Sequence, residues 1–128
     1  MAGSFYDAQN AWVLANPKVS KPLSHKQALN LVEKVCKAHR LSRPSLLLEP
    51  RINPERIAAW YREGCIRVPG FPVESWVVWH ELAHHGADTR ARNKDATQHG
   101  PGFRRWYLRI VGEEAGDKVA ARLAEALK

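Results

Sequence analysis

The residues best suited to chemistry in this 128-residue chain lie in the segment His80-Glu81-Leu82-Ala83-His84. On a helix, residues four apart lie on one face about 6 Å apart along the axis, so His80 and His84 can bind a single metal ion. Imidazole nitrogens are good zinc ligands, and a catalytic zinc site keeps one position open for water. Glu81 is rotated about 100° from His80 around the helix, so we expect its carboxylate to reach this water rather than the metal.

Zinc lowers the pKa of bound water to about 7, and a neighbouring carboxylate can accept the proton as hydroxide attacks a carbonyl carbon. The HExxH pattern on a helix is typical of metallopeptidases. It therefore predicts a zinc-dependent hydrolase with Glu81 as general base and a peptide or protein as substrate; another amide would suit the same chemistry. In a purely structural alternative, His84 and His85 meet the negative end of the helix dipole.

A catalytic zinc ion needs a third protein ligand. The metzincin pattern would place Gly at position 87 and His at position 90, but this chain has Ala87 and Arg90 there. Metzincins also have a Met-turn, whereas the only methionine here is Met1, so that class is excluded.

His99 is the preferred third ligand, because it follows a polar stretch long enough to return the chain to the metal. Glu113 and Glu114 are the alternative. As an acidic pair at the expected start of the last helix, they already have a structural explanation in the helix dipole.

Apolar spacing and end signals predict five helices that would position these residues. They are expected at residues 5–15, 25–39, 73–85, 101–111 and 113–127. Ser24 is a suitable N-cap for the second helix. Gly86 and Gly112 are expected to end the third and fourth helices, and residues 87–98 form a polar loop.

Three β-prone segments complete the pattern. Residues 46–48 are expected to form a buried strand, and residues 57–61 and 65–68 a hairpin whose turn needs a positive φ angle at Gly64. The strand at 64–68 is expected to form the sheet edge beside the cleft, where an extended substrate adds by main-chain hydrogen bonds. Together these elements predict an α+β fold in one domain, residues 1–128: a short sheet packed on the HExxH helix, with flanking N- and C-terminal helices.

Three segments carry a resemblance to a known family: residues 64–69, 76–85 and 99–103. They resemble the SprT-like (Spartan-type) zincin core and, more closely, a family of small HExxH metallohydrolases of phage and bacterial genomes. The resemblance covers about residues 63–111 and implies a minimal zincin fold, with His80, His84 and His99 as zinc ligands and Glu81 as general base. SprT-like proteases usually carry a C-terminal zinc ribbon or DNA-binding extension. This sequence contains neither, so a DNA-linked protease role does not follow.

Charge and composition add weaker expectations. Twenty Lys and Arg against thirteen Asp and Glu leave a net charge of +7, with a basic excess over residues 86–110. This balance permits a nucleic-acid partner, although a solvated basic face explains it equally well. No apolar run exceeds five residues and no signal peptide is recognisable, so we expect no membrane span and a cytoplasmic location. Cys36 and Cys65 fit no zinc pattern and are expected as buried thiols.

Several residues have more than one interpretation. Tyr107 could donate a hydrogen bond to a developing oxyanion, but it fits the apolar stripe of its helix and is expected in the core. His85 points about 100° away from His84 and is expected at the surface. The tryptophans expected in the core are Trp60, Trp76 and Trp79.

The alternative function is a non-enzymatic binding module for nucleic acid or a protein, in which zinc is structural. A fourth side chain on the metal would indicate such a module, whereas an open fourth position would indicate an enzyme.

Overall fold

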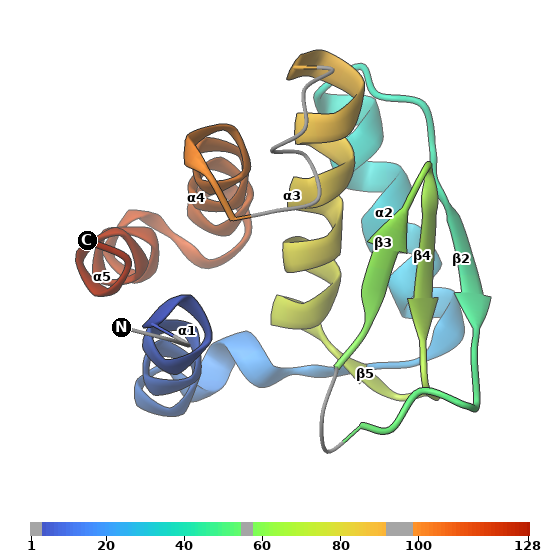
Figure 1. Cartoon of the computed structure of the whole chain (residues 1–128), viewed down its shortest axis with the longest axis horizontal. Coiled ribbons are helices and arrows are strands. Elements are labelled where there is room, and N and C mark those ends of the chain that lie inside the picture. The colour runs from blue at the N-terminus through green and yellow to red at the C-terminus, as the bar shows by residue number, and fades with distance from the viewer. Residues whose placement is uncertain (1–3, 55–57, 92–98) are drawn as a thin grey trace.

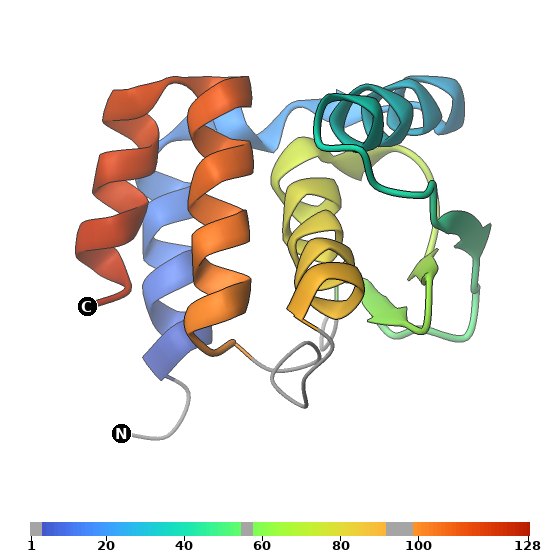
Figure 2. The same cartoon turned by 90° about the horizontal axis from the view of Figure 1, so that it is seen from above.

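The computed structural model describes residues 4–54, 58–91 and 99–128. Helix α3 lies between a three-stranded sheet and a group of three helices formed by α1, α4 and α5 (Figures 1 and 2). Helix α2 lies on the same side of α3 as the sheet. The described elements are α1 (Ser4–Ala15), the 3-10 helix η1 (Pro17–Ser20), β1 (Pro22–Leu23), α2 (His25–Ala38), β2 (Ser45–Leu48), β3 (Trp60–Arg62), β4 (Cys65–Val68), β5 (Val73–Glu74), α3 (Ser75–Ala91), α4 (Pro101–Ala115) and α5 (Asp117–Ala126). The expected α+β class is confirmed.

The three-stranded sheet has the order β2-β4-β3. Strands β3 and β4 form the predicted hairpin, and its two-residue turn has positive φ angles at Glu63 (48°) and Gly64 (80°). The hairpin is shorter than predicted, since β3 begins at Trp60; the predicted strand residue Ile57 lies outside the described residues.

The prediction that the strand at 64–68 forms the sheet edge beside the cleft is wrong. Strand β2 pairs in parallel with β4, so β4 has a neighbour on each side and is the central strand. The edge that faces α3 is β3 instead (Figure 1). Strands β2 and β4 pair in parallel although they lie about 20 residues apart, and such pairing leaves no local signal in the sequence. The hairpin pattern alone therefore did not show that β4 has a second neighbour.

Strand β2 is only partly buried, contrary to the expectation for residues 46–48. Leu46 is buried, but Leu47 and Leu48 are 43% and 53% exposed. The strand lies at the edge of the sheet, so a run of leucines there does not imply burial on both faces.

Helix α3 begins later and ends later than predicted. Val73 and Glu74 pair with β1 before the helix starts at Ser75. Gly86 does not end the helix, which continues to Ala91. A methyl group on Gly86 would lie 2.5 Å from the ring of Trp106 on α4, so this glycine permits the close approach of two helices rather than a left-handed cap.

This close approach makes Gly86 a sensitive position. Gly86→Ala is expected to lower the free energy of unfolding by about 1–3 kcal/mol, because the added methyl group forces Trp106 or the helices to move. Gly102→Ala, in the first turn of α4 with no atom within 4 Å of the added carbon, is the matched control and is expected to be neutral or slightly stabilising. Urea unfolding followed by circular dichroism measures both; equal stability of the two variants would contradict the packing argument.

Gly112 likewise does not end a helix, contrary to the prediction. Helix α4 passes through it to Ala115, and Gly116, with a φ angle of 99°, separates α4 from α5. Glu113 and Glu114 therefore lie in the last turn of α4 rather than at the start of a helix. Their carboxylates face α2, where they pair with His39 at 2.7 Å and Lys34 at 3.1 Å, respectively.

The remaining local predictions agree with the structure. Helix α1 matches its predicted range within one residue, and Ser24 caps α2 through a capping box completed by Gln27. The polar residue Gln9 is also buried on α1, and so is Asn16, which caps η1 after the helix. Among the described residues, no helix is long and apolar enough to cross a membrane.

Candidate metal centre

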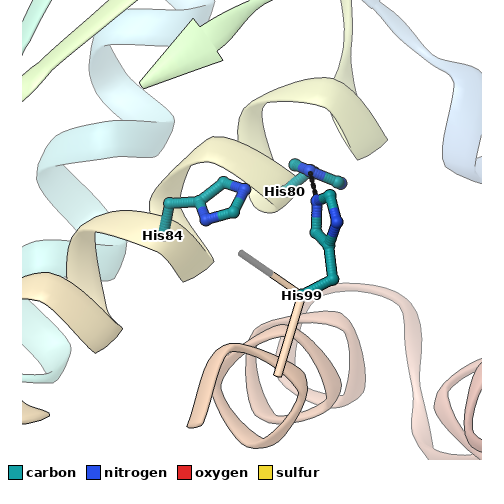
Figure 3. Close-up of side chains that lie close together, drawn as sticks. All are labelled: His80, His84 and His99. Carbon is teal, nitrogen blue, oxygen red and sulfur yellow. Dashed lines mark hydrogen bonds between the residues drawn. The ribbon is translucent and has the colours of Figure 1, made fainter. Parts of the chain in front are cut away.

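Helices α3 and α4 bring three histidines together, as Figure 3 shows. His80 and His84 project from the same face of α3, and His99 precedes the first turn of α4. The ring centroids lie 5.0 Å (His80–His84), 5.0 Å (His80–His99) and 5.1 Å (His84–His99) apart, and one nitrogen from each ring lies within 4.8 Å of the others. The three side chains expected as ligands therefore converge on one point.

The nitrogen spacing fits a tetrahedral zinc site. His80 Nε2 lies 3.2 Å from His99 Nε2. Two nitrogens that bind one tetrahedral zinc ion at about 2.0–2.1 Å lie about 3.3–3.4 Å apart. A nitrogen of His84 lies within 4.8 Å of both, and three imidazole nitrogens are a donor set that suits zinc.

The protonation of these rings also suits a metal. Burial, with His84 and His99 close by, lowers the pKa of His80 well below its usual value. Burial, His84 and Arg104 lower the pKa of His99 to about 4. Both rings are therefore neutral at physiological pH, and the neutral imidazole is the form that binds a metal ion.

Gln9 of α1 fixes the tautomer of His80. The side-chain oxygen of Gln9 lies 2.6 Å from His80 Nδ1 and accepts a hydrogen bond of 2.7 Å from the Tyr107 hydroxyl. Because this oxygen is an acceptor, His80 Nδ1 carries the proton and the lone pair of Nε2 faces the other histidines. This is the kind of outer partner that orients metal-binding histidines. Gln9 was not predicted from the sequence, although a polar residue four positions after Phe5 on an apolar helix face is a signal for it.

Gln9→Leu is expected to weaken zinc affinity by about 10–100-fold, because His80 loses the acceptor that sets its tautomer. Tyr107→Phe is the matched control. It removes the other hydrogen bond to Gln9 but leaves the acceptor for His80, so it is expected to change zinc affinity much less. Competition with a fluorescent zinc chelator measures both affinities, and equal losses would contradict the orienting role.

His99 is held from two sides. The ring of Phe5 stacks on it with centroids 3.9 Å apart and an interplanar angle of 6°. Arg104 Nε donates to the His99 carbonyl at 2.8 Å, and the same guanidinium donates to the carbonyl of Leu127. The third histidine is therefore positioned by α1 and α4 together, and the cation of Arg104 is engaged in the fold.

Glu81 lines the same cleft as the three histidines, a cavity of about 530 Å³. Its side chain is 5% exposed, and no hydrogen bond joins it to another described residue. Burial raises the pKa of Glu81 to about 8. A carboxyl group whose pKa lies near neutrality is suited to exchange protons at physiological pH, and a nearby cation would favour its ionised form.

Other candidate residues lie elsewhere. Glu113 and Glu114 pair with α2, so within the described residues they do not join the histidine group. Tyr107 is fully buried in the core and donates to Gln9, which leaves it no direct access to the cleft. The expectation of a surface position for His85 is wrong: it is 2% exposed, and its ring nitrogens contact the Ser42 carbonyl at 2.6 Å and the Tyr61 hydroxyl at 3.0 Å.

Two of the three tryptophans expected in the core are only half-buried. Trp79 is buried, but Trp60 and Trp76 line the cleft. Cys36 is buried as expected, and Cys65 is half-buried. Of the stretch at 86–110 with the predicted basic excess, residues 92–98 lie outside the described residues.

No protein-family model, curated protein or solved structure matches the chain. The resemblance to SprT-like zincins therefore remains a prediction. The geometry itself defines the class of site: three imidazoles that converge beside a buried carboxyl group in an open cleft.

Proposed function

We propose that the protein is a zinc-dependent hydrolase, and specifically a metallopeptidase, with His80, His84 and His99 as the zinc ligands. The observation that carries the proposal is the convergence of these three side chains next to Glu81, on the wall of a cleft large enough for part of a peptide. Zinc supplies Lewis acidity, which polarises a carbonyl group and lowers the pKa of water.

The residues of the chain have separate roles in this proposal. Glu81 accepts a proton from the water that attacks the carbonyl carbon, and it returns this proton to the amine nitrogen as the C–N bond breaks. Gln9 keeps the Nε2 lone pair of His80 directed at the metal position. Phe5 and Arg104 hold His99 in place.

Strand β3 is suited to bind the substrate backbone. In a hairpin with a two-residue turn, the closing pair, here Arg62 and Cys65, exchanges main-chain hydrogen bonds, and the next pair, Tyr61 and Ile66, does not. The N–H and C=O groups of Tyr61 therefore point away from β4, toward the outer edge of β3. An extended peptide that pairs with this edge would lie along the cleft wall to which Tyr61 belongs.

A structural zinc site is supported less well than a catalytic one. Structural zinc normally has four protein ligands, whereas the group found among the described Cys, His, Asp and Glu residues has three members. A free position beside a carboxyl group favours the enzyme over the binding module.

The proposal is tested by measuring the metal content of the purified protein and digesting a broad peptide library with it. We expect about one zinc ion per chain and cleavage that stops on treatment with a chelator and returns on addition of zinc. Stoichiometric zinc with a fourth protein ligand in its X-ray absorption spectrum, together with no cleavage, would support the structural module instead.

A further inference from the structure

Aromatic side chains form much of the cleft wall beside the three histidines. Trp76 lies one helical turn before His80 on the same face of α3, about 6 Å away along the axis. Trp60 lies on β3, the strand that faces α3, next to Tyr61. Both residues are half-buried and belong to the cleft wall, with Tyr6 of α1 as a further aromatic residue there.

Polar partners hold the two indoles in place. Trp76 Nε1 donates a hydrogen bond of 2.6 Å to Glu74. The guanidinium carbon of Arg67 lies 5.3 Å from the ring centroid of Trp60. These partners are not part of the cleft wall, whereas Trp60 and Trp76 are, so the partners position both rings without occupying the wall. Rings that are already positioned lose little side-chain entropy on binding, so the apolar contact contributes more of its energy to affinity.

The cleft differs in charge from the rest of the molecule. The chain carries a net charge of +7, yet no Lys or Arg lies among the described residues of the cleft wall. The aliphatic part of that wall consists of small or apolar residues: Pro54, Ala58, Ala59 and Val77. The described part of this wall offers no cation to pair with a phosphate or a substrate carboxylate, and its apolar surface suits an uncharged peptide segment.

We propose that the cleft selects peptides with an aromatic or large aliphatic side chain next to the bond to be cleaved, and that Trp60 and Trp76 form the pocket for this side chain. The selection of a scissile bond rests on the proposed hydrolase function. The apolar pocket itself rests only on the place of Trp60 and Trp76 in the cleft wall, so binding and cleavage can be tested separately.

Binding is tested by NMR on purified Glu81→Gln protein, so that the peptides are not consumed. The ¹⁵N-labelled chain has five indole N–H signals, one for each Trp. Titration with the capped tripeptide Ala-Phe-Ala is expected to shift the Trp60 and Trp76 signals saturably. The signal of Trp12, whose buried Nε1 donates to the Val119 carbonyl, should stay unchanged. Ala-Asp-Ala is expected to bind at least tenfold more weakly; equal affinities would overturn the pocket.

Variants separate the pocket from general stability. Trp76→Ala is expected to weaken binding of Ala-Phe-Ala at least tenfold and that of Ala-Ala-Ala by less than twofold, whereas Trp76→Phe retains the preference because an aromatic ring remains. Leu14→Ala is the control, since Leu14 is 82% exposed and is not part of the cleft wall. A Trp76→Phe protein that folds and has no preference for Phe over Ala would contradict the assignment.

The cleavage assay then distinguishes the two proposals. Zinc-loaded wild-type protein that cleaves a peptide library without any preference for apolar side chains would overturn the pocket and leave the hydrolase intact. Saturable binding at Trp60 and Trp76 without cleavage by zinc-loaded protein would overturn the hydrolase and leave the pocket intact. An eight-nucleotide thymidine oligomer that shifts the same indole signals more tightly than Ala-Phe-Ala would overturn the peptide assignment.

Discussion

Glu81→Gln is expected to leave zinc binding intact and to lower turnover by about 10²–10⁴-fold, the range typical for loss of a general base. Gln has nearly the same shape as Glu but does not accept a proton at physiological pH, so the variant removes the base and preserves the volume. The wild-type carboxyl is 5% exposed, and burial raises its pKa to about 8. Since the fold already disfavours a charge at this position, the neutral amide is not expected to destabilise the metal-free protein.

Three measurements check this expectation: zinc content, thermal stability and peptide cleavage at saturating enzyme. Glu125→Gln is a suitable control, because the Glu125 side chain is 75% exposed on α5 and is not part of the cleft wall. It is expected to match the wild-type protein in all three. A zinc-loaded Glu81→Gln protein that cleaves peptides at the wild-type rate would refute the role of Glu81 as general base.

His99→Ala is expected to weaken zinc binding by at least about two orders of magnitude, because losing a ligand costs more than the 10–100-fold typical of an outer partner. His80 and His84 remain on α3, but two imidazoles do not hold zinc firmly. The substitution also removes the ring that stacks on Phe5, so some stability will be lost through packing. His99→Phe keeps a ring for this stacking and should show the same loss of zinc affinity.

The double variant Glu113→Gln, Glu114→Gln tests the alternative third ligands directly. Both carboxylates pair with α2, so the variant is expected to change zinc affinity by less than about twofold while it weakens the packing of α2 on α4. Titration with a chelator of known affinity measures zinc binding in each variant. If the double variant lost zinc and His99→Ala retained it, the proposed ligand set would be wrong.

The candidate site depends on helix α1, although α1 is far in sequence from the three histidines. It supplies the hydrogen bond to His80 through Gln9, the stacking partner of His99 through Phe5, and part of the cleft wall through Tyr6. Burial, together with the charge of Glu81, raises the pKa of Tyr6, so this phenol keeps its proton at physiological pH. The resemblance from sequence covered only about residues 63–111, and these contributions lie outside it.

Local signals predicted local structure well. The helical range of α1, the Ser24 cap of α2 and the two-residue turn at Gly64 each depend on side chains within a few positions, and each agrees with the structure. At Gly86 and Gly112, which were expected to end helices, the local signal failed. A glycine ends a helix only where packing leaves room for a positive φ angle, whereas Gly86 stays helical against Trp106.

The sequence by itself determined which side chains one helical turn places together, because the 3.6-residue period puts His80 and His84 on one face and turns Glu81 aside. It also indicated His99 as a third ligand, but not what holds it. Only the tertiary structure decided that Phe5, Gln9 and Arg104 orient the histidines and that β3 rather than β4 borders the cleft. The reason is physical: apart from the hydrogen bond of Arg104 to His99, these contacts join segments far apart in the chain. Such pairings depend on how whole elements pack, which no short sequence pattern records.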